Sequence, residues 1–203
     1  MGKPIDSERH HDKMVQRKEL HDKKMAEKTA DKGLLIVHTG TGKGKSSSAF
    51  GMVMRGITHG FNIGIVQFIK GDWESGERDV LMKFPEQVEI HAMGEGFTWE
   101  TQDRDRDIEV TKKAWAKSKE FIEDPNVKMV VLDELNIALR YDYLELDDVI
   151  ETLKNRAADK HIIVTGRNAK PELIEAADLV TEMKLIKHPF KEQGIKAQKG
   201  IEY

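Results

Sequence analysis

The chain has 203 residues and a formal net charge of −3, and charged residues make up 34% of it. This length suits one domain with a real hydrophobic core, and the near-neutral charge gives no general attraction to nucleic acid or to an anionic membrane. The absence of cysteine excludes disulfides, iron–sulfur clusters and thiol catalysis. The charged N-terminus lacks the apolar core of a signal peptide, and no apolar run is long enough to span a bilayer, so we expect a cytoplasmic protein.

The first 31 residues differ in composition from the rest of the chain. They are nearly all charged or polar, and nothing after Pro4 breaks a helix. We therefore predict a charged, solvated helical arm at residues 1–31, followed by one domain at residues 32–203.

From Gly33 onward, short apolar runs alternate with helical patterns. We expect strands at residues 33–39, 62–70, 88–93, 128–134, 161–166 and 179–186. We expect helices at residues 45–59, 77–83, 103–123, 135–143, 147–157 and 171–177. Strands that are apolar throughout and alternate with helices predict a doubly wound α/β domain, with a mostly parallel six-stranded sheet covered on both faces. The remaining C-terminal run is loop-like, and its apolar residues indicate that it docks on another surface.

A glycine-rich stretch, TGTGKGKS, lies where the first strand passes into the first helix. Thr39 stands at the first position of the phosphate-loop pattern G-x-x-x-x-G-K-[ST], and Gly44, Lys45 and Ser46 fill its last three positions. Main-chain N–H groups in such a turn point at an anion, and the helix N-terminus adds a favourable dipole. We therefore expect a P-loop NTPase-like domain that binds phosphate through Thr39, Gly40, Thr41, Gly42, Lys43, Gly44, Lys45, Ser46 and Ser47. The alternative is an ordinary glycine-rich turn with two solvated lysines.

An acidic pair follows the fourth predicted strand, in MVVLDE. Asp133 comes after four apolar residues, where it and Glu134 would face a Mg²⁺ ion across from the hydroxyl of Ser46. Alternatively, both acids simply begin the next helix, a position that favours negative charge. Together with the glycine-rich loop, the pair predicts a magnesium–nucleotide site without specifying its chemistry.

Two aromatic residues stand in the glycine-bearing stretch MGEGFTWETQ, at residues 93–102. Large aromatic side chains are costly to leave in water. Phe97 and Trp99 therefore either fold back into the core or form the wall of an apolar pocket.

Several of these segments occur together and in order: TGTGKGKSSSAFG, VQFIKGDWESGERD, GFTWETQ, VVLDELN and KAQKGIEY. From about Gly33 to Tyr203 the chain resembles the ATP:corrinoid adenosyltransferases of the cob(I)yrinic acid a,c-diamide adenosyltransferase class. The resemblance implies that Co(I) of a corrinoid substrate attacks the 5′ carbon of the co-substrate ATP, with Mg²⁺ present, and that triphosphate departs. It also implies that the loop holds the terminal phosphates in a reversed sense, so that the ribose faces the corrinoid.

The resemblance assigns roles to individual residues. Phe97 and Trp99 match aromatics that face the corrinoid and would exclude water and a lower axial ligand from cobalt, which makes Co(II) easier to reduce. Lys45 would stabilise the departing triphosphate, and Arg167 would lie near the phosphates. Thr41 and Ser46 stand where the family commonly has Asn and Thr, and both remain small and polar. A homodimer and a flavoprotein reductant are further implications.

Two other functions are compatible with the same motifs. A P-loop NTPase or kinase would transfer the γ-phosphoryl group and would need a residue such as Glu134 to position water or a hydroxyl. A corrinoid carrier would bind adenosylcorrinoid without making it, although the complete loop and Asp133 argue against a passive role. The eight histidines show no spacing typical of a metal site.

Overall fold

The computed structural model describes residues 7–69, 76–93 and 103–201. The chain divides into two compact units, Met1–Lys32 and Gly33–Tyr203. The first unit contains helix α1 (Ser7–Ala26), and its side chains from Arg9 onward are exposed. Of the helices in the described ranges, none is both long and apolar enough to cross a membrane.

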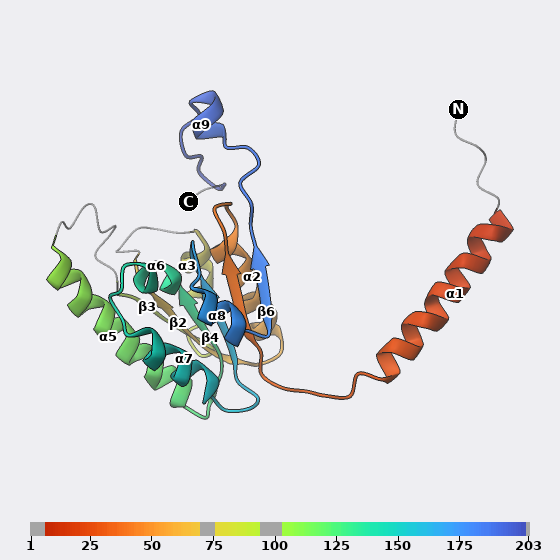
Figure 1. Ribbon diagram of the computed structural model, residues 1–203, viewed down its shortest axis with the longest axis horizontal. Coiled ribbons are helices and arrows are strands. Elements are labelled where there is room, and N and C mark those ends of the chain that lie inside the picture. The colour runs from red at the N-terminus through yellow and green to blue at the C-terminus, as the bar shows by residue number, and fades with distance from the viewer. Residues whose placement is uncertain (1–6, 70–75, 94–102, 202–203) are drawn as a thin grey trace. The chain divides into compact units, whose positions relative to one another are not determined.

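The second unit is built on one six-stranded sheet, in which every neighbouring pair of strands is parallel (Figure 1). The strand order is β3-β2-β4-β5-β1-β6. The strands are β1 (Leu35–Thr39), β2 (Asn62–Gln67), β3 (Val88–Ala92), β4 (Val127–Asp133), β5 (His161–Thr165) and β6 (Leu179–Glu182). The predicted α/β fold class is confirmed, and the sheet is parallel throughout.

Helices cover both faces of this sheet. They are α2 (Lys45–Thr58), α3 (Gly76–Leu81), α5 (Arg104–Glu123), α6 (Leu135–Arg140), α7 (Leu146–Lys154) and α8 (Pro171–Ala176). Successive strand residues point to opposite faces, so Leu35 and Val37 join a core with α5, α6, α7 and α8, whereas Ile36 joins a second core with α2 and α3. This double burial explains why the strands are apolar throughout.

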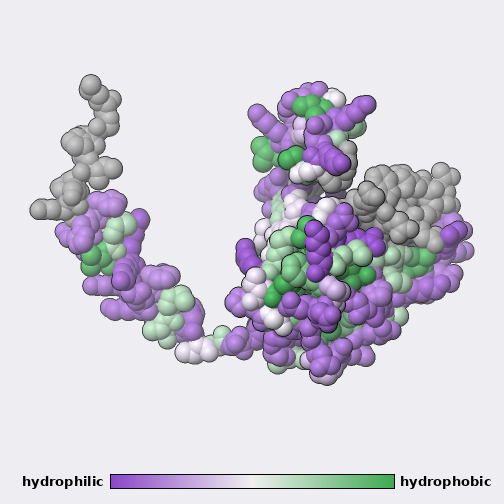
Figure 2. All heavy atoms as spheres, turned by 180° about the vertical axis from the view of Figure 1, so that it is seen from behind, coloured by the Kyte–Doolittle hydropathy of each residue, from purple (hydrophilic) through white to green (hydrophobic). Residues whose placement is uncertain are grey.

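The C-terminal part of the chain departs from the prediction in two ways. The strand expected at residues 179–186 ends at Glu182, because Glu182 pairs with Thr39, the last residue of β1, the strand beside it. The segment after it is not only loop, since it contains a short helix, α9 (Pro189–Gln193), which begins at a proline and ends at Gly194. Its apolar side chains are exposed in this chain: Phe190 is 65% and Ile201 is 83% exposed. Figure 2 shows hydrophobic atoms among the hydrophilic ones on this segment.

A buried lysine closes the C-terminal end of α5. Lys160 is only 2% exposed, and its Nζ donates hydrogen bonds to the main-chain oxygens of Phe121 (2.9 Å) and Asp124 (2.6 Å). The last carbonyl groups of a helix have no partner within the helix, so this ammonium caps them. Burial lowers the pKa of Lys160, and the nearby charges of Asp124 and Asp159 act in the opposite direction.

Replacing Lys160 with methionine keeps most of the side-chain volume but removes the charged donor from two main-chain carbonyls. We expect the free energy of unfolding to fall by about 2 kcal/mol, as measured by urea denaturation followed by circular dichroism. Lys154→Met, at an exposed lysine that ends α7, is the matched control and should change this energy by less than about 0.5 kcal/mol. A Lys160→Met protein as stable as the wild type would show that the cap makes no net contribution.

Candidate phosphate-binding site

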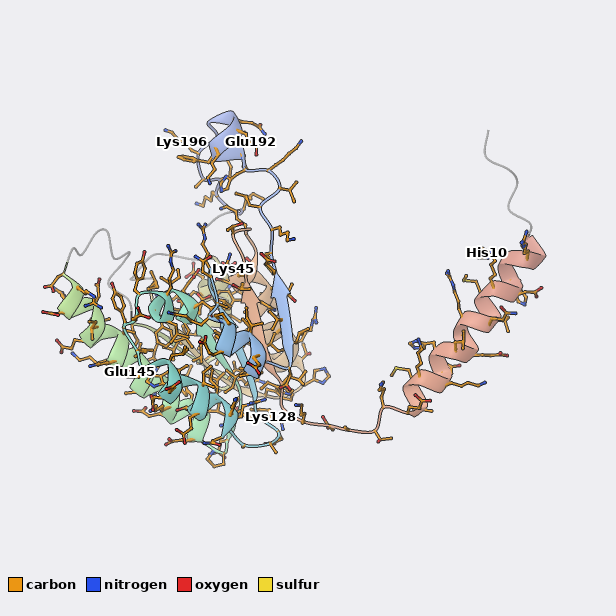
Figure 3. All side chains as sticks on the ribbon, viewed as in Figure 1. His10, Lys45, Lys128, Glu145, Glu192 and Lys196 are labelled. Atoms are coloured by element: carbon orange, nitrogen blue, oxygen red, sulfur yellow. The ribbon has the colours of Figure 1, made fainter. Side chains whose placement is uncertain are left out.

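The glycine-rich loop joins β1 to α2 at the carboxyl end of the parallel sheet, where ligands bind in open α/β folds. A pocket of about 540 Å³ opens at the loop. Its lining comprises residues 42–47 of the loop and α2, together with Glu77, Glu134, Arg167 and Ile201. Lys45 is labelled at this end of the sheet in Figure 3. The structure therefore brings the second half of the predicted loop together with Glu134 and Arg167.

The first half of the loop is shaped by the chain that leaves β6. The Gly42 N–H donates to the main-chain oxygen of Met183 (2.6 Å), and the Met183 N–H donates to the oxygen of Thr39 (2.9 Å). A Cβ atom at Gly40 would lie 2.4 Å from the Met183 oxygen, and one at Gly42 would lie 2.9 Å from the Lys184 oxygen. Both distances are too short for a side chain, so this close approach of two main chains requires glycine at both positions.

Thr39 ends β1 and fixes a second neighbouring loop. It is buried, and its Oγ1 accepts a hydrogen bond from the main-chain N–H of Ala169 at 3.0 Å. Thr41, in contrast, is exposed. The side chain of Thr39 therefore joins the glycine-rich loop to the loop at Ala169, and it is not part of the pocket lining.

Lys45 holds a positive charge at the start of α2. Its side chain is 6% exposed, and its Nζ donates to the main-chain oxygen of Gly42. Burial lowers the pKa of Lys45, while the carboxylate of Glu134 acts to raise it and the guanidinium of Arg167 acts to lower it further. A cation that is partly desolvated and close to main-chain N–H groups favours a polyanionic ligand.

The two predicted carboxylates lie in different surroundings. Asp133 ends β4 and is fully buried, and its Oδ1 accepts a hydrogen bond from Thr165 Oγ1 (2.7 Å) and its Oδ2 one from Gln67 Nε2 (3.0 Å). Glu134 follows in the left-handed conformation (φ 64°), and its side chain lines the pocket. Of the two acids, Glu134 is the one at the pocket surface.

The donor set of the pocket suits Mg²⁺. The hydroxyl of Ser46 and the carboxylate of Glu134 line the same pocket, and both are hard oxygen ligands. Within the residues that the structure describes, no group of three or more His, Asp or Glu side chains could hold a metal by itself. Mg²⁺ fits such a sparse set, because it commonly keeps several waters and completes its shell with substrate phosphates.

Three polar residues at this end of the sheet escaped sequence reasoning: Glu77, Gln67 and Thr165. Glu77 lines the pocket from α3 and accepts a hydrogen bond from Ser47 Oγ at 3.1 Å. Gln67 and Thr165 are the last residues of β2 and β5. A single polar residue ending an apolar run was the available signal for the latter two. The predicted aromatic residues Phe97 and Trp99 lie outside the described residues.

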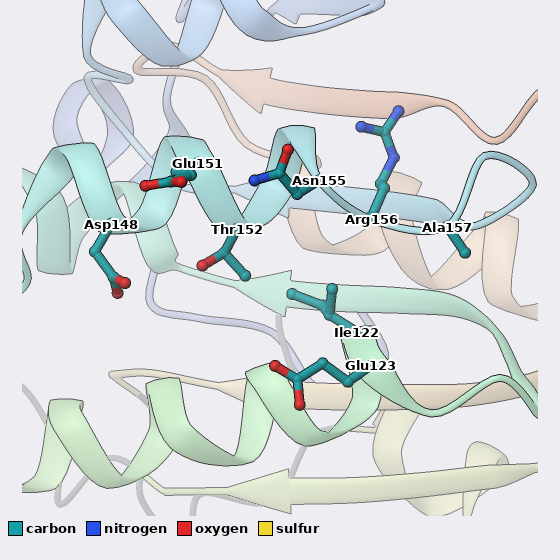
Figure 4. A pocket seen from close by; sticks show the side chains of 8 residues that line it. All are labelled: Ile122, Glu123, Asp148, Glu151, Thr152, Asn155, Arg156 and Ala157. Atoms are coloured by element: carbon teal, nitrogen blue, oxygen red, sulfur yellow. The ribbon is translucent and has the colours of Figure 1, made fainter.

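A second pocket, of about 450 Å³, is lined by the end of α5, by α7 and by the turn after it (Figure 4). Its lining is net negative, since Glu123, Asp148 and Glu151 outnumber Arg156. Asp148 already accepts hydrogen bonds from Trp115 Nε1 and Lys119 Nζ, each at 2.7 Å. This lining is less suited to phosphate than the pocket at the glycine-rich loop, where Lys43, Lys45 and Arg167 outnumber Glu77 and Glu134.

Known proteins resemble this chain over nearly its whole length. The family model described as "ATP:corrinoid adenosyltransferase BtuR/CobO/CobP" matches residues 31–203. A corrinoid adenosyltransferase of Pseudomonas aeruginosa is 54% identical over 200 residues, which cover 98% of each chain. The corrinoid adenosyltransferase CobA of Salmonella typhimurium is 42% identical over 199 residues, covering 98% of this chain and all of the relative. This chain therefore belongs to the ATP:corrinoid adenosyltransferase BtuR/CobO/CobP family.

Proposed function

We propose that this chain transfers the 5′-deoxyadenosyl group of ATP to the Co(I) centre of a corrinoid and releases triphosphate. The observation that carries the proposal is the pocket in which Lys45 lies buried at the start of α2, with Lys43 and Arg167 also in its lining. Family membership supports the same reaction, since the matched relatives are corrinoid adenosyltransferases over almost their full length.

The phosphate end of ATP would be held by the loop. Main-chain N–H groups at the start of α2 and the charges of Lys43, Lys45 and Arg167 would bind the triphosphate. Ser47 would add a hydroxyl close to them. The same groups would stabilise the charge that develops on the triphosphate as the C5′–O bond breaks, which lowers the barrier to its departure.

Ser46 and Glu134 would hold Mg²⁺ beside the phosphates, with Asp133 acting from behind them. A bound Mg²⁺ supplies further neutralisation of charge on the leaving triphosphate. The loop glycines Gly40, Gly42 and Gly44, together with Thr39 and Thr41, would set the path of the main chain around the phosphates.

The corrinoid end of the site is inferred from the family resemblance. The electron pair of Co(I) forms the new cobalt–carbon bond, and the electron pair of the C5′–O bond leaves with the triphosphate. No proton is transferred in this substitution, so no general base is required. Phe97 and Trp99 would exclude water and a lower axial ligand from cobalt. Homodimerisation and reduction by a flavoprotein stay predictions from the resemblance.

Product analysis separates the proposed transferase from an NTPase or kinase. We expect that ATP, Mg²⁺ and a chemically reduced corrinoid give a photolabile alkylcobalt spectrum, with one triphosphate released per adenosylcorrinoid formed. Omission of the corrinoid is the control, and it should stop ATP consumption. Release of ADP and phosphate, or ATP turnover without corrinoid, would favour phosphoryl transfer instead.

Lys45→Ala tests the phosphate-loop assignment. Without the buried ammonium, the departing triphosphate would lose one of its positive partners, and we expect ATP-dependent activity to fall by about 100-fold or more. Circular dichroism should be unchanged. Lys83→Ala, at an exposed lysine just after α3, is the matched control and should keep wild-type activity. Full activity in Lys45→Ala would remove Lys45 from the site.

Trp99→Ala tests the proposed exclusion of an axial ligand. We expect adenosylation that starts from Co(II) and a reductant to lose more activity than adenosylation that starts from pre-reduced Co(I), because only the first requires the unfavourable reduction. The Co(I) assay serves as the internal control. Equal losses in the two assays would contradict the role assigned to this tryptophan.

A further inference from the structure

Three buried polar residues lie side by side where β2, β4 and β5 end. The sheet register pairs Gln67 with Asp133, and Thr165 directly follows Val164, the partner of Leu132. The side chains of Gln67, Asp133 and Thr165 are 3%, 0% and 0% exposed. Polar groups buried this deeply are costly unless they are hydrogen-bonded to one another.

The hydroxyl of Thr165 makes two hydrogen bonds of opposite sense. It donates its proton to Asp133 Oδ1 (2.7 Å), and it accepts the main-chain N–H of Glu134 (3.0 Å). A hydroxyl has only one proton to donate. The Asp133 carboxylate, held on its other side by Gln67 Nε2 at 3.0 Å, therefore fixes which way the Thr165 hydroxyl turns and leaves its lone pairs for Glu134.

The main chain at Glu134 needs such support. Its φ of 64° and ψ of 20° place a residue that has a side chain in the left-handed region, which costs about 1–2 kcal/mol. Such conformations persist where the surroundings over-determine them, and they gather at functional sites. The hydrogen bond from the Glu134 N–H to Thr165 is a direct restraint on this turn.

The space for the Glu134 side chain comes from the residue after Thr165. Gly166 has a φ of 126°, and a Cβ atom there would lie 3.1 Å from Glu134 Oε2 and 2.8 Å from Asn136 Cβ. Asn136 Nδ2 donates to the Gly166 oxygen at 2.9 Å, which ties the start of α6 to the turn after β5. The end of β5 thus supplies both the hydrogen bond and the room that Glu134 requires.

We infer that Thr165 is a positioning residue for Glu134, with Asp133 and Gln67 serving to orient the Thr165 hydroxyl. In this arrangement Asp133 does not contact the bound metal or phosphates directly. It orients Thr165, which holds the main chain of Glu134, and Glu134 would contact the metal. The inference rests on the proposed function, because it assumes that Mg²⁺ and the ATP phosphates occupy the pocket that Glu134 lines. It adds Thr165 and Gln67 to the residues that determine metal-dependent nucleotide binding.

Thr165→Val tests this role, because it replaces the hydroxyl with a methyl group of similar size. Without the acceptor, the Glu134 turn loses its restraint, and the carboxylate no longer stays beside the phosphates. We expect the Kd for ATP in saturating Mg²⁺, measured by isothermal titration calorimetry, to rise about tenfold, as is usual when a residue that orients a metal ligand is lost. The Kd for ATP in EDTA should stay within about twofold of the wild-type value, because the loop itself is unchanged.

Two further variants separate positioning from packing. Thr165→Ser keeps the hydroxyl and should restore most of the Mg²⁺-dependent affinity. Ser118→Ala removes another fully buried hydroxyl, which donates to the Ala114 oxygen within α5 at 2.8 Å, and should leave both Kd values unchanged. Circular dichroism verifies that each variant is folded. If the Thr165→Val protein does not fold, Thr165→Ala takes its place, and its Kd values in Mg²⁺ and in EDTA are compared in the same way.

The inference is overturned if the hydroxyl-free variant binds ATP in Mg²⁺ as the wild type does, if it loses the same factor in EDTA, or if serine fails to restore binding. These outcomes differ from a failure of the proposed function. If the wild-type protein itself does not bind ATP in Mg²⁺, the proposed nucleotide site is wrong. If the wild type binds and only the variant comparison fails, the nucleotide site stands without the role of Thr165.

Discussion

The contact between the glycine-rich loop and the chain leaving β6 is the constraint on which the site depends. Two main-chain hydrogen bonds join Thr39 and Gly42 to Met183, and the approach leaves no room for a side chain at Gly40 or Gly42. The glycines of a phosphate loop are usually explained from the ligand side, as room for the phosphates. Here Gly40 and Gly42 are required by a contact within the protein, since the loop packs against the main chain just after the edge strand β6.

This constraint accounts for the charge arrangement of the pocket. The loop is hydrogen-bonded to Met183, just after β6, and α2 begins directly after this loop. There Lys45 donates its ammonium to the main-chain oxygen of Gly42 and is shielded from solvent. A buried ammonium is costly unless it is paired, and in the described structure that carbonyl, the carboxylate of Glu134 and, less strongly, that of Asp133 favour its charge. A polyanion that entered the pocket would complete this pairing, so the site is prepared electrostatically for phosphate before any ligand binds.

The sequence was sufficient for much of this arrangement, and the reasons are physical. Apolar runs reveal parallel strands because both faces of the sheet are buried, and the glycine–lysine pattern marks a loop whose main chain must approach something closely. Gln67 and Thr165 were not predicted, because one polar residue at the end of a strand looks like an ordinary boundary. Their importance depends on the strand order, which places β2 and β5 on either side of β4. That order is a property of the whole sheet and is not encoded near either residue.

The acidic pair shows how neighbouring residues of the same charge come to differ in what they do. Asp133 is the last residue in the ladder of a central strand, so its side chain is enclosed by the ends of β2 and β5 and both of its oxygens accept hydrogen bonds there. Glu134 leaves the ladder through a left-handed turn, which directs its side chain to the pocket. The motif alone would assign both acids to one metal ion. The structure instead separates an acid that is hydrogen-bonded to the strand ends from an acid whose side chain lines the pocket, and the turn between them makes that separation.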